Sequence, residues 1–237
     1  MNKKVPFVSI AAVGGAVLLL IGTMLHPMHE DPNEAAAAFK EYAADSHWLN
    51  SHLLQLAGVA LMIVVLLRIS RAMAGGPADG IAAICAHGAA AGLAVACALQ
   101  AVDGIALKAM VDAWTAAPLD RQASLFHATF AVRQIEIGLA SMLSLVLGSV
   151  LCLFGIAQIM DGRFPRVFGY LIMAYGALSM VAGYIMASSG FSELAMTINM
   201  PASLLLLAWV LAVAYYCWRY PEVLNSRLTK SEMRLNN

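Results

Sequence analysis

Charged residues are scarce in this chain. Lysine, arginine, aspartate and glutamate make up 12% of it, about half of their usual share in soluble domains. Hydrophobic residues account for 61%, and the mean hydropathy is +0.77. So few polar side chains cannot cover a soluble core of this size. The composition therefore excludes an ordinary soluble domain and indicates an integral membrane protein.

The familiar motifs of soluble enzymes are also missing. The chain has no HExxH, no histidine box of the HxxHH type, no GxSxG, no Walker A loop and no GxGxxG after a strand. The four cysteines form no CxxC pair, so they give no sign of a redox or zinc motif. These absences favour a protein that is not an enzyme, and they leave any cofactor unknown.

The chain does contain six long apolar runs. A bilayer core about 30 Å thick requires roughly 20 apolar residues in an α-helix, and the runs approach or reach this length. We expect an all-α polytopic membrane protein with six transmembrane helices in a single domain, residues 1–237, with a short cytoplasmic tail at residues 218–237. The runs are Val5–Leu25, Leu53–Ile69, Ile81–Val102, Ile137–Met160, Val167–Ser188 and Pro201–Cys217.

Basic residues are unevenly divided between the two ends of these runs. With the N-terminus placed inside, ten of the fourteen lysines and arginines fall on inner segments and four on outer segments. The positive-inside rule then predicts that both termini are cytoplasmic. We expect a multi-pass protein of the bacterial inner (cytoplasmic) membrane that has the lipid bilayer as its main partner. The tail is short and mixed in charge, which argues against nucleic-acid binding.

Two polar segments between the runs favour helix on the outer side. After the first run, Asp31 can cap a helix with Pro32 at its first position, and strong helix formers follow as far as Ala44. We expect a short amphipathic helix there, between spans one and two. The segment from Asp103 to Glu136 adds polar extensions to spans three and four, either as a protruding helical hairpin or along the lipid headgroups.

Small residues recur at helical spacing in the later runs. Gly88 and Gly92 form a GxxxG pair, and Gly169, Gly176 and Gly183 lie seven residues apart. Such seams let helix backbones approach closely in lipid. We expect them to pack helices within one chain, and a homo-oligomer interface is the alternative.

Four of the six histidines lie in the segment from His26 to His52, between the first two runs. Imidazoles next to carboxylates suit zinc or copper. Pro27 disfavours helix at the residue before it, so we expect His26 and His29 in a turn. We predict that His26, His29 and His47 are ligands of a divalent cation. The alternative is that they are interfacial histidines, which hydrogen-bond to helix ends and headgroups.

Polar residues at membrane depth form a second candidate site, because such residues are costly in lipid and often functional. Arg133 and Glu136 are three residues apart and can pair with each other or with Asp103. We predict an outer vestibule that binds a small ligand, and the alternative is a satisfied polar network that fixes helix register. The predicted lining residues are His52, Gln55, Asp103, His127, Arg133 and Glu136.

Three motifs carry a resemblance to a known family. They are His26-Pro27 at the end of the first span, DPNEAAAAFKEYAADSHWL before the second, and FPRVFGY at the start of the fifth. In these motifs the chain resembles a poorly characterised bacterial family of six-helix membrane proteins, which is classed as a domain of unknown function. The resemblance covers most of the chain and implies the same fold, but it implies no activity.

The sequence leaves three functions open. The first is an accessory, sensor or binding protein whose outer face, rich in histidine and acids, takes a cation or small ligand. The second is a transporter of a small solute or cation. The third is a haem or metal redox protein, for which His52 and His127 would be the axial ligands of a haem.

The charge distribution makes a prediction about topology. A reporter enzyme that works only in the cytoplasm should be active when fused after Asn237. Ten basic residues lie on the same side of the membrane as this terminus, and the positive-inside rule places that side in the cytoplasm. The same reporter inserted after Ala117 should be inactive. If only the second fusion were active, the orientation in the membrane would be the opposite of the predicted one.

Overall fold

The structure is a computed structural model that describes residues 6–225. It is 86% helical and contains no strand within these residues. The all-α fold class expected from the sequence is confirmed. The elements are α1 (Phe7–Leu25), α2 (Ala35–Ala44), α3 (Trp48–Ala72), α4 (Asp79–Gln100), the π-helix η1 (Ala101–Leu107), α5 (Lys108–Thr115), α6 (Leu119–Asp161), α7 (Arg166–Ser189), α8 (Glu193–Arg219) and the short 3-10 helix η2 (Pro221–Leu224).

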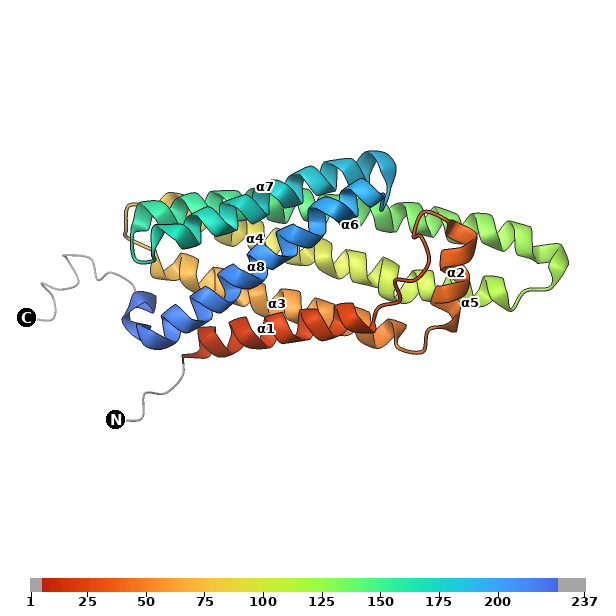
Figure 1. The fold of residues 1–237 in the computed structure, drawn as a ribbon, viewed down its shortest axis with the longest axis horizontal. Helices are drawn as coiled ribbons and strands as arrows, with labels where there is room; N and C mark the ends of the chain where they lie inside the picture. The colour runs from red at the N-terminus through yellow and green to blue at the C-terminus, as the bar shows by residue number, and fades with distance from the viewer. Residues whose placement is uncertain (1–5, 226–237) are drawn as a thin grey trace, which may run out of the picture.

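The long helices form a closed ring of neighbours. Helix α1 packs on α3, α3 on α4, α4 on α6, α6 on α7, α7 on α8, and α8 returns to α1. Figure 1 shows the bundle with α8 crossing obliquely and with the short helix α2 lying across one end. We call this end the α2 end. Helix α1 begins and α8 ends at the opposite end (Figure 1).

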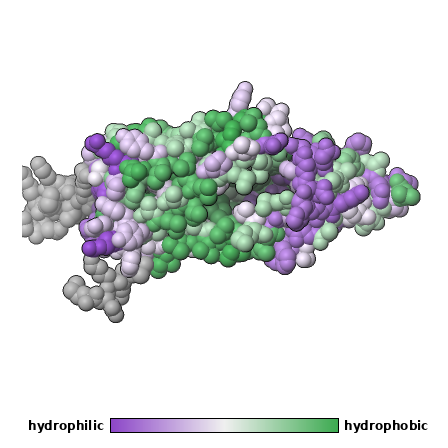
Figure 2. Space-filling model, in the orientation of Figure 1, coloured by the Kyte–Doolittle hydropathy of each residue, from purple (hydrophilic) through white to green (hydrophobic). Residues whose placement is uncertain are grey.

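Six helices are long and apolar enough to cross a membrane. Large hydrophobic side chains face outward along them: Leu20 is 56% exposed, Leu204 67% and Val181 49%. On the face drawn in Figure 2, hydrophobic residues form a broad band and hydrophilic residues lie mainly at the two ends. This pattern is that of a multi-pass membrane protein, and it confirms the six predicted spans.

The spans are longer than the strict apolar runs of the sequence. Helix α3 begins at Trp48, five residues before the predicted Leu53, and α6 begins at Leu119 rather than Ile137. Polar residues therefore continue the helices beyond the apolar runs. Helices η1 and α5 extend α4, and together with the first part of α6 they protrude as a hairpin past α2 (Figure 1). Of the two arrangements considered for residues 103–136, the structure has the protruding hairpin.

The predicted start of α2 is wrong. The helix begins at Ala35 after Glu34, and Asp31 does not cap it. Instead, the Asp31 carboxylate accepts a hydrogen bond from the Asn33 amide at 2.9 Å, which forms a turn before the helix. An aspartate side chain that bonds two residues ahead competes with helix initiation.

Among the helices that pack through small residues, α6 and α7 bring their backbones into close contact. A Cβ atom at Gly176 would lie 2.6 Å from the Gly148 carbonyl oxygen, and one at Gly169 would lie 2.6 Å from the Gly155 carbonyl oxygen. Gly88 and Gly92 of α4 accommodate side chains of α6 in the same way. The seams therefore pack helices within the chain, as expected.

Part of the predicted cytoplasmic tail, residues 226–237, lies outside the described residues, as do residues 1–5. The described start and end of the bundle lie on one side, which agrees with an even number of spans. Their cytoplasmic orientation stays a prediction.

Replacing Gly176 by alanine should destabilise the protein, because the new methyl group would overlap the Gly148 carbonyl. Overpacking of this kind costs about 1–3 kcal/mol, which lowers the unfolding midpoint by roughly 2–10 °C for a chain of this size. Gly138→Ala is the matched control, since Gly138 lies on the partner helix α6 and nothing lies within 4 Å of its Cβ position. Thermal unfolding in detergent measures both, and equal midpoints would contradict the close contact.

Candidate metal centre

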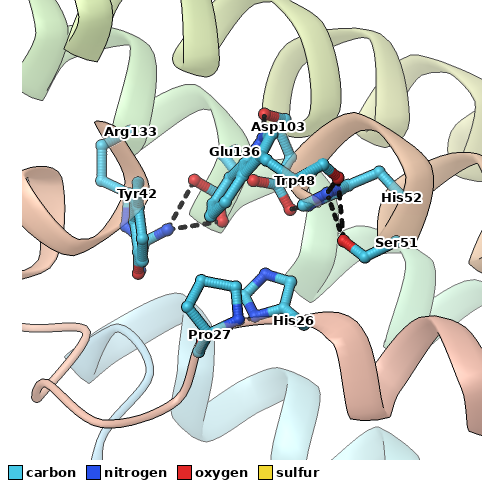
Figure 3. Close-up of polar contacts among 9 residues, drawn as sticks. All are labelled: His26, Pro27, Tyr42, Trp48, Ser51, His52, Asp103, Arg133 and Glu136. Atoms are coloured by element: carbon cyan, nitrogen blue, oxygen red, sulfur yellow. Dashed lines mark hydrogen bonds and ion pairs between the residues drawn. The ribbon is translucent and has the colours of Figure 1, made fainter. Parts of the chain in front are cut away.

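Three side chains from separate parts of the chain converge at the α2 end. His26 follows α1, His52 lies in the second turn of α3, and Asp103 lies in η1. Their ligand atoms all lie within 4.8 Å of one another. His52 is only 1% exposed, and the Asp103 side chain is 15% exposed. We call these three residues the His–Asp site (Figure 3).

Both imidazoles are held in the tautomer that a metal ligand needs. The Nδ1 atom of His26 lies 2.8 Å from the Pro27 carbonyl oxygen, and Nδ1 of His52 lies 2.7 Å from the Trp48 carbonyl oxygen. A carbonyl oxygen can only accept, so each Nδ1 carries the hydrogen. Each Nε2 then keeps its lone pair. This second-shell arrangement, with one ring nitrogen donating to a carbonyl, is usual for histidines that bind metals.

The contact between His52 and Asp103 lacks an ordinary hydrogen bond. Nε2 of His52 lies 3.1 Å from Oδ2 of Asp103, which makes an ion pair when the imidazole is protonated, although among the described residues this nitrogen has no partner that meets hydrogen-bond geometry. Two lone pairs that face each other repel unless a proton or a cation lies between them. Adjacent ligands of a tetrahedral zinc ion are about 3.3 Å apart at Zn–N distances near 2.0 Å. The spacing of Nε2 and Oδ2 therefore suits two ligands of one ion.

The π-helix places Asp103 beside His52. Helix η1 interrupts the continuous α4–α5 helix at residues 101–107, and π-turns of this kind often lie at functional sites. Gly104, the next residue, lets the two elements touch, because a Cβ atom there would lie 2.8 Å from Cβ of His52. The Trp48 indole donates to the Asp103 carbonyl oxygen at 3.1 Å. These contacts fix the carboxylate relative to the imidazole.

Aromatic rings surround the two histidines. The Trp48 ring lies 4.5 Å from the His52 ring and 5.0 Å from the His26 ring, measured between centroids, and the Tyr42 ring lies 4.4 Å from Trp48. Trp48 and Tyr42 also belong to a small hydrophobic cluster with Phe39 of α2. This cluster excludes water on one side of the His–Asp site.

A buried ion pair lies next to the site. Nη1 of Arg133 donates to both carboxylate oxygens of Glu136, at 2.8 and 2.7 Å, and the two residues are 4% and 2% exposed. Asp103 and His52 both act electrostatically on Glu136, which lies between Arg133 and these two residues in Figure 3. We call the His–Asp site together with this pair the chamber.

Arg133 also holds the segment that carries His26. Its Nη2 donates to the Pro32 carbonyl oxygen at 3.2 Å and to the Tyr42 hydroxyl at 3.3 Å. The guanidinium lies over the Phe191 ring at 4.8 Å. Arg133 therefore connects α6 with α2 and with the turn between α7 and α8.

Two groups outside the spans have shifted pKa values. Burial lowers the pKa of the His26 imidazole, which favours the neutral form that binds metals. Burial raises the pKa of the Tyr42 phenol to about 12. Tyr42 therefore stays protonated at neutral pH and adds no charge to the chamber.

The structure brings some residues of both predicted sites together in the chamber and places the others elsewhere. Of the predicted metal ligands, His26 lies in the chamber, whereas His29 and His47 are exposed and do not belong to the His–Asp site. Of the predicted vestibule residues, His52, Asp103, Arg133 and Glu136 line the chamber. Gln55 packs against Gly22 of α1. His127 is exposed on α6 beside Phe126.

Two aromatic residues beside the chamber, Trp48 and Tyr42, were missed from the sequence. Trp48 and His52 are four residues apart, so they share one face of α3, and this spacing was the available signal for Trp48. The Asp103-Gly104 dipeptide inside an apolar helix was a second signal, because a glycine there often marks a close approach. Nothing local identified Tyr42, which α2 brings in from a distance.

Lys108 holds the C-terminal end of α2 over the chamber. Its Nζ donates to the carbonyl oxygens of Tyr42 and Ala43, at 3.1 and 2.9 Å, and to the Asp112 carboxylate at 2.8 Å. Charged donors near helix C-termini bind the free carbonyl groups there. These bonds join α2 to α5.

Lys108→Met should therefore loosen α2. Loss of charged hydrogen bonds of about 1.5–3 kcal/mol should raise the hydrogen-exchange rate of the α2 amides by roughly tenfold or more. Lys40→Met, at an exposed position of the same helix, is the control and should leave exchange unchanged. Mass-spectrometric hydrogen exchange measures both variants, and an unchanged rate in Lys108→Met would show that the aromatic contacts alone hold α2.

Comparison of the chain with protein-family models, with curated proteins and with solved structures gives no match. The likeness to a six-helix bacterial family stays a resemblance of motifs, and the function is argued from the geometry of the chamber.

Proposed function

We propose that this protein is a membrane-integral binding protein for a divalent transition-metal ion, which it holds in the His–Asp site. The observation that carries the proposal is the convergence of His26, His52 and Asp103 within 4.8 Å, with both Nδ1 atoms bound to carbonyl oxygens. With both imidazoles neutral, each of the three residues offers one possible ligand atom in the same space.

The ligand set favours a borderline metal. Two imidazole nitrogens and one carboxylate oxygen suit zinc, and also cobalt or iron in the divalent state. Magnesium and calcium prefer an all-oxygen set. The site lacks sulfur ligands, which disfavours copper(I). Zinc is therefore the first ion to test.

The position of the site favours binding or sensing over transport. Among the described residues, no second group of potential metal ligands lies along the bundle or at its opposite end. A pathway that conducts the ion would be expected to offer further groups of metal ligands across the membrane. With the predicted topology, the site faces the outside of a bacterial inner membrane, so the protein would bind an ion from that side as an accessory or sensor protein.

Zinc titration of the purified protein in detergent tests the proposal. The wild-type protein should bind one zinc ion per chain. Changes to second-shell residues typically weaken metal binding by about 10–100-fold, so removal of a ligand in His52→Ala or Asp103→Asn should weaken it by roughly 100-fold or more. Calorimetry with a competing chelator gives both the stoichiometry and the affinity.

The control is His87→Ala. His87 has the same bond from Nδ1 to the carbonyl oxygen four residues earlier, at 2.7 Å, but it is exposed on α4. This variant should bind zinc as the wild type does. His29→Ala and His127→Ala test the groupings predicted from the sequence. Equal loss in all these variants, or no stoichiometric zinc in the wild type, would refute a metal centre at the His–Asp site.

A further inference from the structure

We infer that the metal-loaded chamber binds a small anion directly on the ion, next to Arg133 and Glu136. This inference rests on the proposed metal binding and adds a second ligand to it. The ligand class is a monovalent anion that can coordinate a metal, such as a carboxylate, hydroxide, azide or a halide. Three features of the chamber support it: its charge, its number of ligands and its access.

The first feature is the net charge of the chamber. With both carboxyl groups ionised, Asp103 and Glu136 each contribute one negative charge, and Arg133 contributes one positive charge. The empty chamber therefore carries one negative charge when both histidines are neutral. A divalent ion reverses this to one positive charge. A net charge that is buried away from water is costly, and one bound anion would neutralise it.

The second feature is an incomplete ligand set. The His–Asp site supplies three ligand residues, whereas zinc takes at least four ligands. Sites with three protein ligands keep a position for water or for an exogenous ligand. Glu136 does not fill this position in the structure, because Arg133 engages both of its carboxylate oxygens.

The third feature is a recess that leads to Arg133 from the surface. A cavity of about 280 Å³ is lined by Pro32, Asn33, Arg133, Gln134, Ser188 and Ser189, together with neighbouring residues. Asn33, Gln134 and Ser188 are exposed, so the recess reaches the surface. The recess is lined by Arg133 but by none of the three ligand residues, so an anion would pass Arg133 to reach the ion. The Nε atom of Arg133 is buried and has no hydrogen-bond partner among the described residues.

The experiment uses cobalt(II) in place of zinc, because its visible absorption reports changes in the ligand shell. Azide is the probe anion, added at fixed pH to the cobalt-loaded full-length protein. The wild-type spectrum should change with saturable azide binding. No response to azide in protein that does bind cobalt would overturn the inference and leave the metal proposal intact. Failure to bind cobalt at all would overturn both.

Two single variants should shift azide affinity in opposite directions. Arg133→Gln makes the cobalt-loaded chamber neutral and should weaken azide binding by roughly tenfold or more, as expected for removal of one nearby charge. Glu136→Gln adds one positive charge to the loaded chamber and should strengthen azide binding by a similar factor. It should also weaken cobalt binding, which separates a charge effect from a packing effect.

The double variant, Arg133→Gln with Glu136→Gln, is the matched control. It keeps the net charge of the wild type but loses the guanidinium, so its azide affinity should exceed that of Arg133→Gln by roughly tenfold, as expected for the restored charge. If a single variant does not fold because it leaves an uncompensated buried charge, the double variant can still be compared with the wild type. Equal azide affinity in all three variants, or a loss in the double variant as large as in Arg133→Gln, would overturn the inference.

Discussion

The buried guanidinium of Arg133 is the constraint on which the α2 end of this protein depends. A charge at 4% exposure is tolerated only when its hydrogen-bond donors and its charge are matched. Glu136 matches the charge from one turn along the same helix. Its Nη2 donates to Pro32 and Tyr42, so the bonds of this one side chain also order the segment that contains His26.

The π-helix η1 is the second feature that shapes the site. A regular α-helix would rotate residues after Gln100 differently around the axis, and Asp103 would then leave the position that it shares with His52. The close approach of Gly104 to His52 and the hydrogen bond from the Trp48 indole hold this irregular turn. Irregular backbone inside a membrane helix needs such partners, because lipid offers none.

The sequence predicted part of the chamber. The pairing of Arg133 with Glu136 follows from their spacing of three residues on one helix. The selection of His26 as a ligand candidate also came from the sequence. Its grouping with His29 and His47 did not anticipate His52 as its neighbour, because the chain turns at Pro27 and returns through α2 before α3 begins. Residues distant in sequence meet there through packing, and no local pattern encodes that path.

The sequence by itself determined the fold class, since six apolar runs of bilayer length leave few alternatives to a six-helix membrane bundle. It also predicted close helix packing within the chain, because glycines at helical spacing serve close helix contact in lipid, but the pairing of α6 with α7 came from the structure. Only the tertiary structure decided which polar groups share the chamber. Helix rotation, the π-turn and the docking of α2 each move a side chain by several ångströms, and a site with ligand atoms within 4.8 Å is sensitive to every one of these displacements.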